Sequence, residues 1–128
     1  LLGNKVESVR FGTATDRAVP ADYDGDGRAD PAVYRNGVWY LLRSEQGFAA
    51  VTFGSASDKP VVGDYDGDNK ADAAIYRNGS WFILQSRDGL AVFELGVATD
   101  KPVPADYDGD GKTDPGVYRG GVWHLRRS

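Results

Sequence analysis

Residues 64–72 read Asp-Tyr-Asp-Gly-Asp-Asn-Lys-Ala-Asp, and two further copies of this stretch lie elsewhere in the chain. Residues 22–30 read Asp-Tyr-Asp-Gly-Asp-Gly-Arg-Ala-Asp and residues 106–114 read Asp-Tyr-Asp-Gly-Asp-Gly-Lys-Thr-Asp, so each step is 42 residues. Carboxylates at positions 1, 3, 5 and 9, with a turn former at position 6, match the first nine positions of a calcium-binding loop. Because four like charges so close together repel one another, they favour a bound cation.

The loop positions indicate how each ion would be held. Side chains at positions 1, 3 and 5 offer oxygens, position 7 offers its backbone carbonyl, and position 9 binds directly or through water. Position 12, a bidentate Glu in the EF-hand, is Val33, Ile75 or Val117, so water or a neighbouring residue would complete each site. The alternative is a set of Asx-turns without metal. We predict about three Ca²⁺ per chain and the following ligands: Asp22, Asp24, Asp26, Arg28 (carbonyl), Asp30, Asp64, Asp66, Asp68, Lys70 (carbonyl), Asp72, Asp106, Asp108, Asp110, Lys112 (carbonyl) and Asp114.

Composition limits the class of protein. The 128 residues suit a single domain, 1–128, with 41% hydrophobic and 27% charged residues. The formal net charge is −4, but twelve of the 19 acidic residues lie in the three loops, and three bound Ca²⁺ would bring the charge to +2. No Lys/Arg run indicates nucleic-acid binding, and no apolar run approaches the roughly 18 residues of a membrane span.

Other markers repeat with the same step of 42 residues. Phe-Gly or Leu-Gly pairs begin at 11, 53 and 95, Tyr-Arg pairs begin at 34, 76 and 118, and tryptophan stands at 39, 81 and 123. A period of about 40–45 residues with four short strands is typical of a β-propeller blade. The sequence therefore predicts an all-β fold of four-stranded antiparallel blades, at about 17–54, 59–96 and 101–128. Asn-Gly pairs at 36 and 78 predict hairpins.

The third blade is predicted to lack its outer strand, and a spare outer strand is predicted at residues 5–12. This offset is the one expected for circular closure, in which the N-terminal strand completes the last blade. Three blades are too few for a propeller, which has about four to eight. Three alternatives stay open. The first is a homodimer that forms a six-bladed ring, in which each N-terminal strand completes a blade across the joint or within its own chain. The others are a fragment of a longer propeller, and three blades in an unclosed or novel arrangement.

The Phe-Gly pairs, the Val-Pro-Ala-Asp-Tyr-Asp-Gly-Asp-Gly run and the tyrosine that follows resemble FG-GAP/VCBS-like repeats. This family includes the propeller heads of integrin α subunits, secreted bacterial repeat proteins and some fungal lectins. The resemblance implies a calcium-stabilised β-propeller on the cell surface or outside the cell. It places the family's calcium ligands on the loop positions named above.

We expect a non-enzymatic, extracellular module for adhesion or protein–protein interaction. Sites that lack the position-12 Glu suit the weak extracellular class, with dissociation constants of about 10⁻⁴–10⁻³ M. The alternative is a carbohydrate-binding lectin propeller in which Trp39, Trp81 and Trp123 stack on sugars, although packing between blades is the expected role of one large aromatic per repeat. His124 is the single histidine, so a catalytic set has little support. We expect Asp16, Asp58 and Asp100 to form Asx-turns. We expect the loop tyrosines Tyr23, Tyr65 and Tyr107 to be exposed, the alternative being that they cover the metal.

Overall fold

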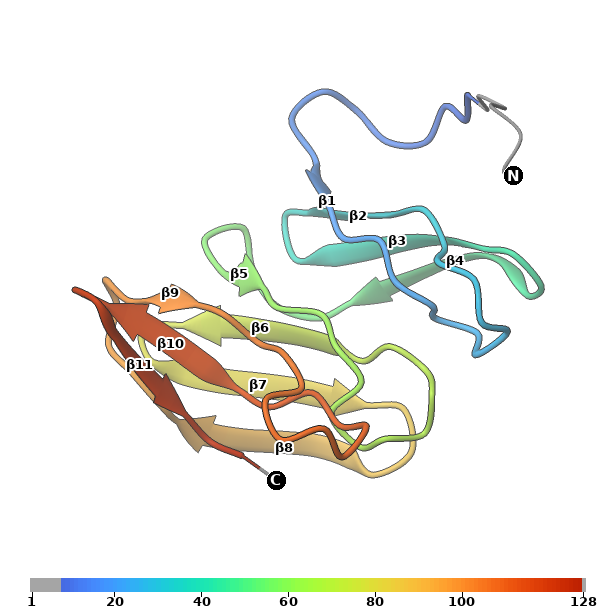
Figure 1. Ribbon diagram of the computed structural model, residues 1–128. Coiled ribbons are helices and arrows are strands. Elements are labelled where there is room, and N and C mark those ends of the chain that lie inside the picture. The colour runs from blue at the N-terminus through green and yellow to red at the C-terminus, as the bar shows by residue number, and fades with distance from the viewer. Residues whose placement is uncertain (1–7, 128) are drawn as a thin grey trace.

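The computed structural model describes residues 8–127, which form three antiparallel sheets (Figure 1). The first sheet has the order β1 (Arg17–Ala18), β2 (Ala32–Arg35), β3 (Val38–Arg43) and β4 (Gly47–Thr52), and the second has β5 (Lys59–Pro60), β6 (Ala73–Arg77), β7 (Ser80–Gln85) and β8 (Gly89–Glu94). The third has three strands, β9 (Lys101–Pro102), β10 (Gly116–Arg119) and β11 (Val122–Leu125). The predicted all-β class is confirmed, and no described residue belongs to a helix long and apolar enough to span a membrane.

The hairpins between the second and third strands of each sheet follow from their turn residues. Asn36 and Gly37 have φ of 51° and 83°, and Asn78 and Gly79 have φ of 50° and 91°. Both central residues of a two-residue hairpin of this kind need positive φ, which Asn and Gly adopt most readily. The turns set the register, in which Tyr34 lies opposite Trp39. The hairpins predicted at these Asn-Gly pairs are confirmed.

The apolar core lies between neighbouring sheets. Trp39 packs in one buried cluster with Ile75 of the second sheet, and Trp81 packs in another with Val117 of the third. Both tryptophans are fully buried. The predicted packing role is therefore confirmed for these two residues. Trp123, the third, is 55% exposed and has no such neighbour in the described chain.

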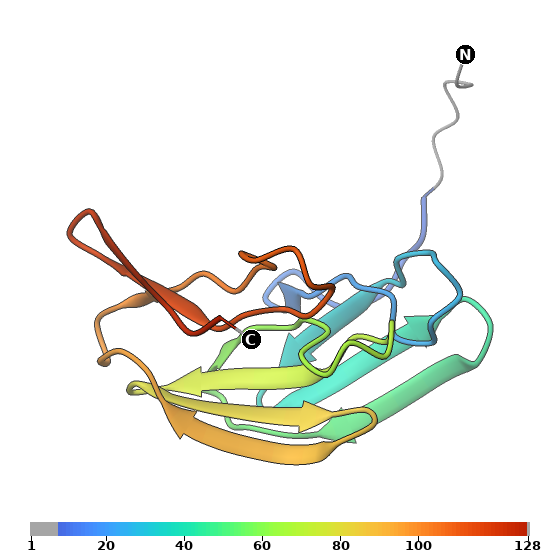
Figure 2. The ribbon, with the colours of Figure 1, turned by 60° about the horizontal axis from the view of Figure 1, so that its bottom comes forward.

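The predicted N-terminal strand is the part of the fold that the structure contradicts. Residues 8–12 form no strand, and residues 5–7 lie outside the described range. Residues 11 and 12 lie against the first sheet, where the Phe11 ring meets the Phe48 ring of β4 edge to face, whereas β11 lies at the other end of the row of sheets (Figures 1 and 2). The third sheet consequently has three strands among the described residues, as predicted for residues 101–128, and residues 8–12 of the same chain do not complete it.

The turn at Gly37 packs closely against the chain that follows β4, and an alanine substitution tests this contact. A Cβ on Gly37 would lie 2.5 Å from the Gly54 carbonyl oxygen, whereas a Cβ on Gly47 would meet nothing within 4 Å, and φ is positive at both. Both alanine variants pay for a left-handed backbone, but only Gly37→Ala also creates an overlap. We expect Gly37→Ala to lower the free energy of unfolding by about 1–3 kcal/mol more than Gly47→Ala in urea denaturation. Equal costs would contradict this packing.

Candidate metal centres

Each acidic loop connects the short first strand of a sheet to its second strand. A backbone bridge closes the loop, pairing Ala21 with Asp30, Gly63 with Asp72 and Ala105 with Asp114. In the second loop, the Asp72 N–H donates to the Gly63 carbonyl over 2.6 Å. The ninth position of the loop is therefore held at the base of the sheet, where its carboxylate is buried.

The aspartate at the first position organises the turn. One oxygen of Asp64 accepts from the Gly67 and Asp68 N–H groups over 2.9 and 3.2 Å, and the other accepts from the Asn69 N–H over 2.9 Å. Asn69 has φ of 69°, close to 87° at Gly27 in the first loop. The chain thus turns back at position 6 as the sequence predicts, and the carboxylates face one another across the loop.

The structure brings the predicted acidic residues into three clusters. Carboxylate oxygens of each cluster lie within 4.8 Å of one another. The second and third clusters contain all four predicted acidic positions, whereas the first omits Asp26, whose oxygens accept from the Arg28 N–H and the Ser44 hydroxyl. Each cluster could hold a metal ion. The members are Asp22, Asp24 and Asp30; Asp64, Asp66, Asp68 and Asp72; and Asp106, Asp108, Asp110 and Asp114.

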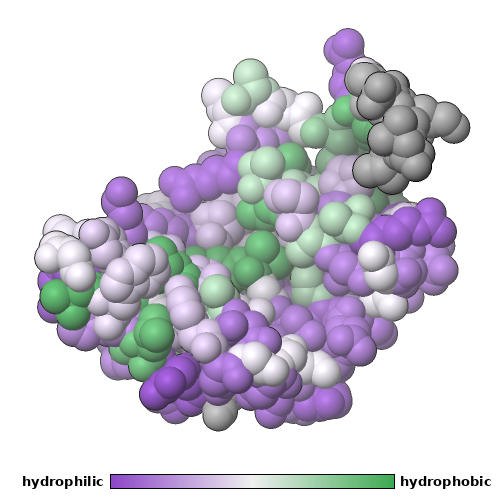
Figure 3. Space-filling model, in the orientation of Figure 1, coloured by the Kyte–Doolittle hydropathy of each residue, from purple (hydrophilic) through white to green (hydrophobic). Residues whose placement is uncertain are grey.

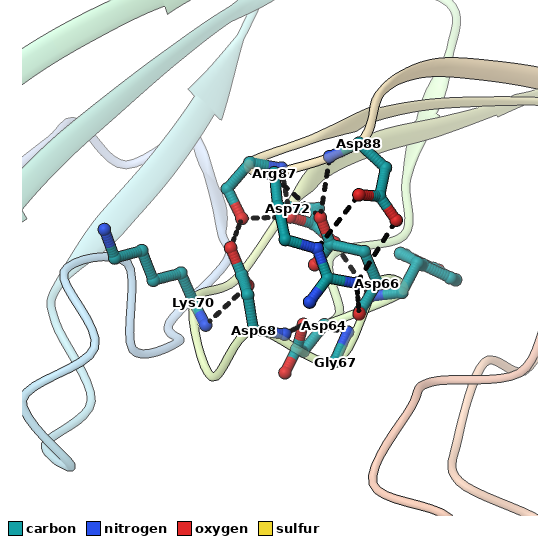
Figure 4. A network of polar contacts seen from close by, with 10 residues as sticks. Asp64, Asp66, Gly67, Asp68, Lys70, Asp72, Arg87 and Asp88 are labelled. Atoms are coloured by element: carbon teal, nitrogen blue, oxygen red, sulfur yellow. Dashed lines mark hydrogen bonds and ion pairs between the residues drawn. The ribbon is translucent and has the colours of Figure 1, made fainter.

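A second turn, between the third and fourth strands, orients the carboxylates of the second loop (Figure 4). The Ser86 N–H and hydroxyl reach the same oxygen of Asp72 over 2.7 and 2.8 Å, and this hydroxyl also lies 2.6 Å from Asp68. The Arg87 N–H donates to Asp66 over 2.8 Å. Hydrogen bonds of this kind fix the direction in which an acidic ligand presents its other oxygen.

The first loop has the same support, which our sequence reasoning missed. The Ser44 N–H donates to Asp30 over 2.9 Å and the Glu45 N–H donates to Asp24 over 2.7 Å. The signal available in the sequence was a serine that recurs at 44, 86 and 128 with the same 42-residue step. The Ser44 and Glu45 donors are backbone N–H groups, which every residue except proline has. Only the serine hydroxyl depends on which amino acid is present, so only the serine could be recognised in the sequence. Ser128 lies outside the described residues.

One oxygen in each of the first two clusters has no protein partner. Asp24 Oδ1 and Asp66 Oδ1 are buried and accept no hydrogen bond, although the other oxygen of each is paired. Asp66 is only 2% exposed. A buried, ionised oxygen without a partner costs a large desolvation free energy. A cation at the centre of the cluster would remove that cost, so the residues present fit a metal ion.

Burial also acts on the charge state of the second cluster. It raises the pKa of the Asp64 and Asp72 carboxyls, because a desolvated carboxylate is harder to ionise. A bound cation would act in the opposite direction by stabilising the ionised form. Two of the four carboxylates of this cluster therefore carry a charge that burial disfavours, and a divalent cation would offset that cost.

The other repeated aspartates serve the scaffold. Asp58 accepts from the Ser55 N–H over 2.8 Å, as the predicted turn requires, and it also forms two 2.8 Å bonds with the Arg77 guanidinium. This pairing holds the pKa of the Asp58 carboxyl below its ordinary value. Arg119 does the same for Asp100, lowering its pKa to about 2. These aspartates are fully buried ion-pair partners and lie outside the acidic clusters.

The loop tyrosines correct a second expectation. Tyr23 and Tyr65 are 9% and 7% exposed, and their hydroxyls donate to the Val19 and Val61 carbonyls over 2.6 and 2.5 Å. Burial raises the pKa of both phenols. The prediction of exposed rings at these positions was wrong. The ring at position 2 instead packs in the buried apolar cluster of its sheet.

Ser86 gives a test of the supporting hydrogen bonds. Replacing it with alanine removes the hydroxyl contacts to Asp68 and Asp72 but leaves the backbone donor in place. We expect Ser86→Ala to weaken calcium binding at one site by roughly 10-fold in isothermal titration calorimetry. The matched control is Ser80→Ala, whose hydroxyl contacts Glu94 at the surface. An unchanged calcium affinity in Ser86→Ala would show that the turn does not position these ligands.

Comparisons of this chain with protein-family models, with curated proteins and with solved structures return no match. The resemblance to FG-GAP/VCBS-like repeats therefore stays a prediction based on the loops and the repeated markers.

Proposed function

We propose that the chain is a calcium-stabilised extracellular repeat module for adhesion or protein–protein interaction. The observation that carries this proposal is the pair of buried, unpartnered oxygens on Asp24 and Asp66, two residues that each belong to a cluster of carboxylates. The metal supplies cross-links between the loop and the sheet when it binds. The chain's own residues orient the acceptors, and the turns at Ser44 and Ser86 hold them in place.

Calcium is the ion that best suits these ligands. It takes about 6–8 oxygen ligands in flexible geometry, whereas Mg²⁺ demands a near-ideal octahedron and gives up its water reluctantly. The clusters offer oxygens alone, all from aspartate side chains of one loop. The position-12 residues Val33, Ile75 and Val117 are buried apolar side chains, so no bidentate Glu completes the set. Weak affinity of this kind suits the millimolar calcium outside cells.

We further propose that the three sheets are blades of a propeller of the FG-GAP/VCBS type, completed as a six-bladed homodimer. Two observations support this arrangement. Each sheet has its strands in sequence order. In addition, the proline-bearing segments that contain β1, β5 and β9 line one shared hollow, as the innermost strands of blades around a common axis would.

Two of the three repeats argue against the lectin alternative, whereas Trp123 in the third is 55% exposed. Trp39 and Trp81 are fully buried and so cannot stack on a sugar, and the guanidinium groups of Arg35 and Arg77 are paired with Asp16 and Asp58. We therefore expect no binding across a glycan array in millimolar calcium. Calcium-dependent binding to a defined sugar would replace the adhesive proposal with the lectin.

Calcium affinity tests the extracellular assignment. We expect calorimetric titration of the metal-free chain to give dissociation constants of about 10⁻⁴–10⁻³ M. Such sites would be filled outside cells and empty at cytosolic calcium concentrations. Sites that fill in the nanomolar to low micromolar range would contradict an extracellular module, and a chain that binds no calcium would contradict the proposal as a whole.

A further inference from the structure

The outer edge of β11 lacks the strand that completes the other two sheets. β4 pairs with β3 and β8 pairs with β7, whereas within residues 8–127 β11 pairs with β10 alone. Val122, Trp123 and Leu125 on β11 are 52%, 55% and 38% exposed. Hydrophobic side chains are visible at this end of the molecule in Figure 3. An exposed hydrophobic strand edge is a template for pairing with another strand.

The matching strand sequence is present in residues 8–11, which join no sheet among the described residues. By the 42-residue step these residues correspond to 50–53 at the end of β4 and to 92–95 at the end of β8. Val9 corresponds to Val51 and Phe93, which lie opposite Trp39 and Trp81. Val9 itself is 61% exposed. Residues 8–127 therefore contain strand-like sequence that is not in a sheet at one end and a sheet of three strands at the other.

The connection that follows this segment already has the form seen between sheets. Gly12 has φ of 102°, compared with 111° at Gly54 and 99° at Gly96. The Thr13 N–H donates to Asp16 over 2.8 Å, and the Ser55 N–H donates to Asp58 over the same distance. Residues 12–16 are thus folded as a link from a preceding blade to the first sheet.

We propose that residues 8–11 of a second copy add to β11 as the fourth strand of the third sheet, antiparallel and with Val9 opposite Trp123. The same exchange in the other direction would close two chains into one ring of six blades. The inference deepens the homodimer proposed above and depends on the propeller arrangement of the sheets.

Side chains on β10 and β11 already present the groups that such a strand would meet. In the complete sheets the tryptophan indole N–H donates to the Phe53 or Leu95 carbonyl, over 3.0 and 3.1 Å. The counterpart acceptor for Trp123 is the Phe11 carbonyl of the second copy. Likewise, the Tyr34 hydroxyl donates to the Ser55 carbonyl over 2.6 Å. The Tyr118 hydroxyl would meet the second copy's Thr13 carbonyl in the same way.

The acidic loops make a backbone hydrogen bond from each loop to the next, and among the described residues the third loop has no partner for it. The Ala71 N–H donates to the Asp22 carbonyl over 2.8 Å, and the Thr113 N–H donates to the Asp64 carbonyl over 2.7 Å, so each loop binds the next. The Asp106 carbonyl has no such donor among residues 8–127. By the repeat, its donor would be the Ala29 N–H of a second copy.

Side-chain packing between the loops follows the same order. A Cβ on Gly25 would lie 3.2 Å from Lys70 Cγ, and a Cβ on Gly67 would lie 3.0 Å from Lys112 Cγ, whereas a Cβ on Gly109 would meet nothing within 4 Å. The counterpart of these lysines is Arg28, and its stem would cover Gly109 of the other copy. The edge of β11, the aromatic contacts and the acidic loops therefore all indicate the same partner, the N-terminal part of a second copy of this chain.

Two pairs of variants test the proposal from both sides. The Phe53 N–H bonds to the Gly37 carbonyl, and N–H groups alternate in direction along a strand. Val9 would therefore donate to β11 and Arg10 would face solvent. Val9→Pro therefore removes a backbone hydrogen bond between the added strand and β11, whereas Arg10→Pro does not.

The second pair of variants lies in the turn between β10 and β11, which would receive the added strand. The Cβ of Gly121→Ala meets nothing within one chain, but by analogy with Gly37 it would overlap the second copy's Gly12 carbonyl. Gly120→Asn restores the Asn-Gly turn and is its control.

The measurement is mass in solution by light scattering, with millimolar calcium and with EDTA. In calcium we expect twice the 13.8 kDa of one chain for the unmodified protein, Arg10→Pro and Gly120→Asn, and the mass of one chain for Val9→Pro and Gly121→Ala. Acrylamide quenching should report Trp123 as protected only in the doubled form. A single-chain mass for the unmodified protein, a larger assembly, or a doubled mass that survives both Val9→Pro and Gly121→Ala would overturn the proposal. Calcium titration of Val9→Pro separates the two ideas, because the loops of a monomer still bind calcium if only the assembly fails.

Discussion

Chelating calcium with EDTA is expected to lower the melting temperature by on the order of 10 °C for each site that was filled. A site that binds only the folded chain adds about 2.7 kcal/mol when calcium is at one hundred times its dissociation constant. For a domain of this size each kcal/mol corresponds to a few degrees in melting temperature. The effect is large because the chain has no cysteine with which to form disulfides and its core is divided into two clusters between sheets.

Calorimetry or thermal denaturation followed by circular dichroism would measure this shift. Excess calcium added after EDTA should restore the original melting temperature, and an equal concentration of magnesium should restore little of it. An identical melting temperature with and without EDTA would mean that the acidic clusters hold no structural ion.

Asp66→Asn is expected to destabilise the protein in calcium by about the contribution of one site, roughly 2.7 kcal/mol, and to cost little in EDTA. The substitution preserves size, and an amide oxygen can still accept from the Arg87 N–H. What it removes is the charge of the buried carboxylate whose Oδ1 lacks a protein partner. Without a cation, the buried charge of Asp66 destabilises the folded chain. Removing it should therefore offset part of any stability that the asparagine loses in other contacts.

Asp58→Asn is the matched comparison. Asp58 is as buried as Asp66 but binds Arg77 instead of facing an acidic cluster. Its loss should lower the free energy of unfolding by about 1–3 kcal/mol through weakened charge-assisted bonds, equally with calcium and with EDTA. Urea denaturation would measure the free energy of unfolding of Asp66→Asn and Asp58→Asn, each in calcium and in EDTA. If the cost of Asp66→Asn is the same with and without calcium, the ligand assignment is wrong.

The repeat made much of the fold and of the candidate site predictable. Asn36-Gly37 fixes a hairpin by its backbone preference, and the alternation that follows places Trp39 in the core. The acidic positions converge because the turn at position 6 and the hydrogen bonds accepted by Asp64 are local properties of nine residues. Local chemistry of this kind is readable without knowledge of the tertiary structure.

Features that depend on distant parts of the chain were harder to predict. The donors at Ser86 and Arg87 come from a turn some twenty residues away and act largely through the backbone, which leaves little trace in residue identity. Tyr65 was expected to be exposed but is buried, because its burial depends on packing against residues outside the loop. Residues 8–11 have the sequence of a strand, yet a strand forms only where a partner edge is within reach.

A crystal structure determined from crystals grown in millimolar calcium is the most direct test of the account. We predict strong anomalous density at the centre of the acidic clusters, with carboxylate oxygens at about 2.3–2.6 Å and with Asp24 Oδ1 and Asp66 Oδ1 among the ligands. Ordered water alone at these positions, with the loops and strands unchanged, would contradict the claim that calcium holds them in place.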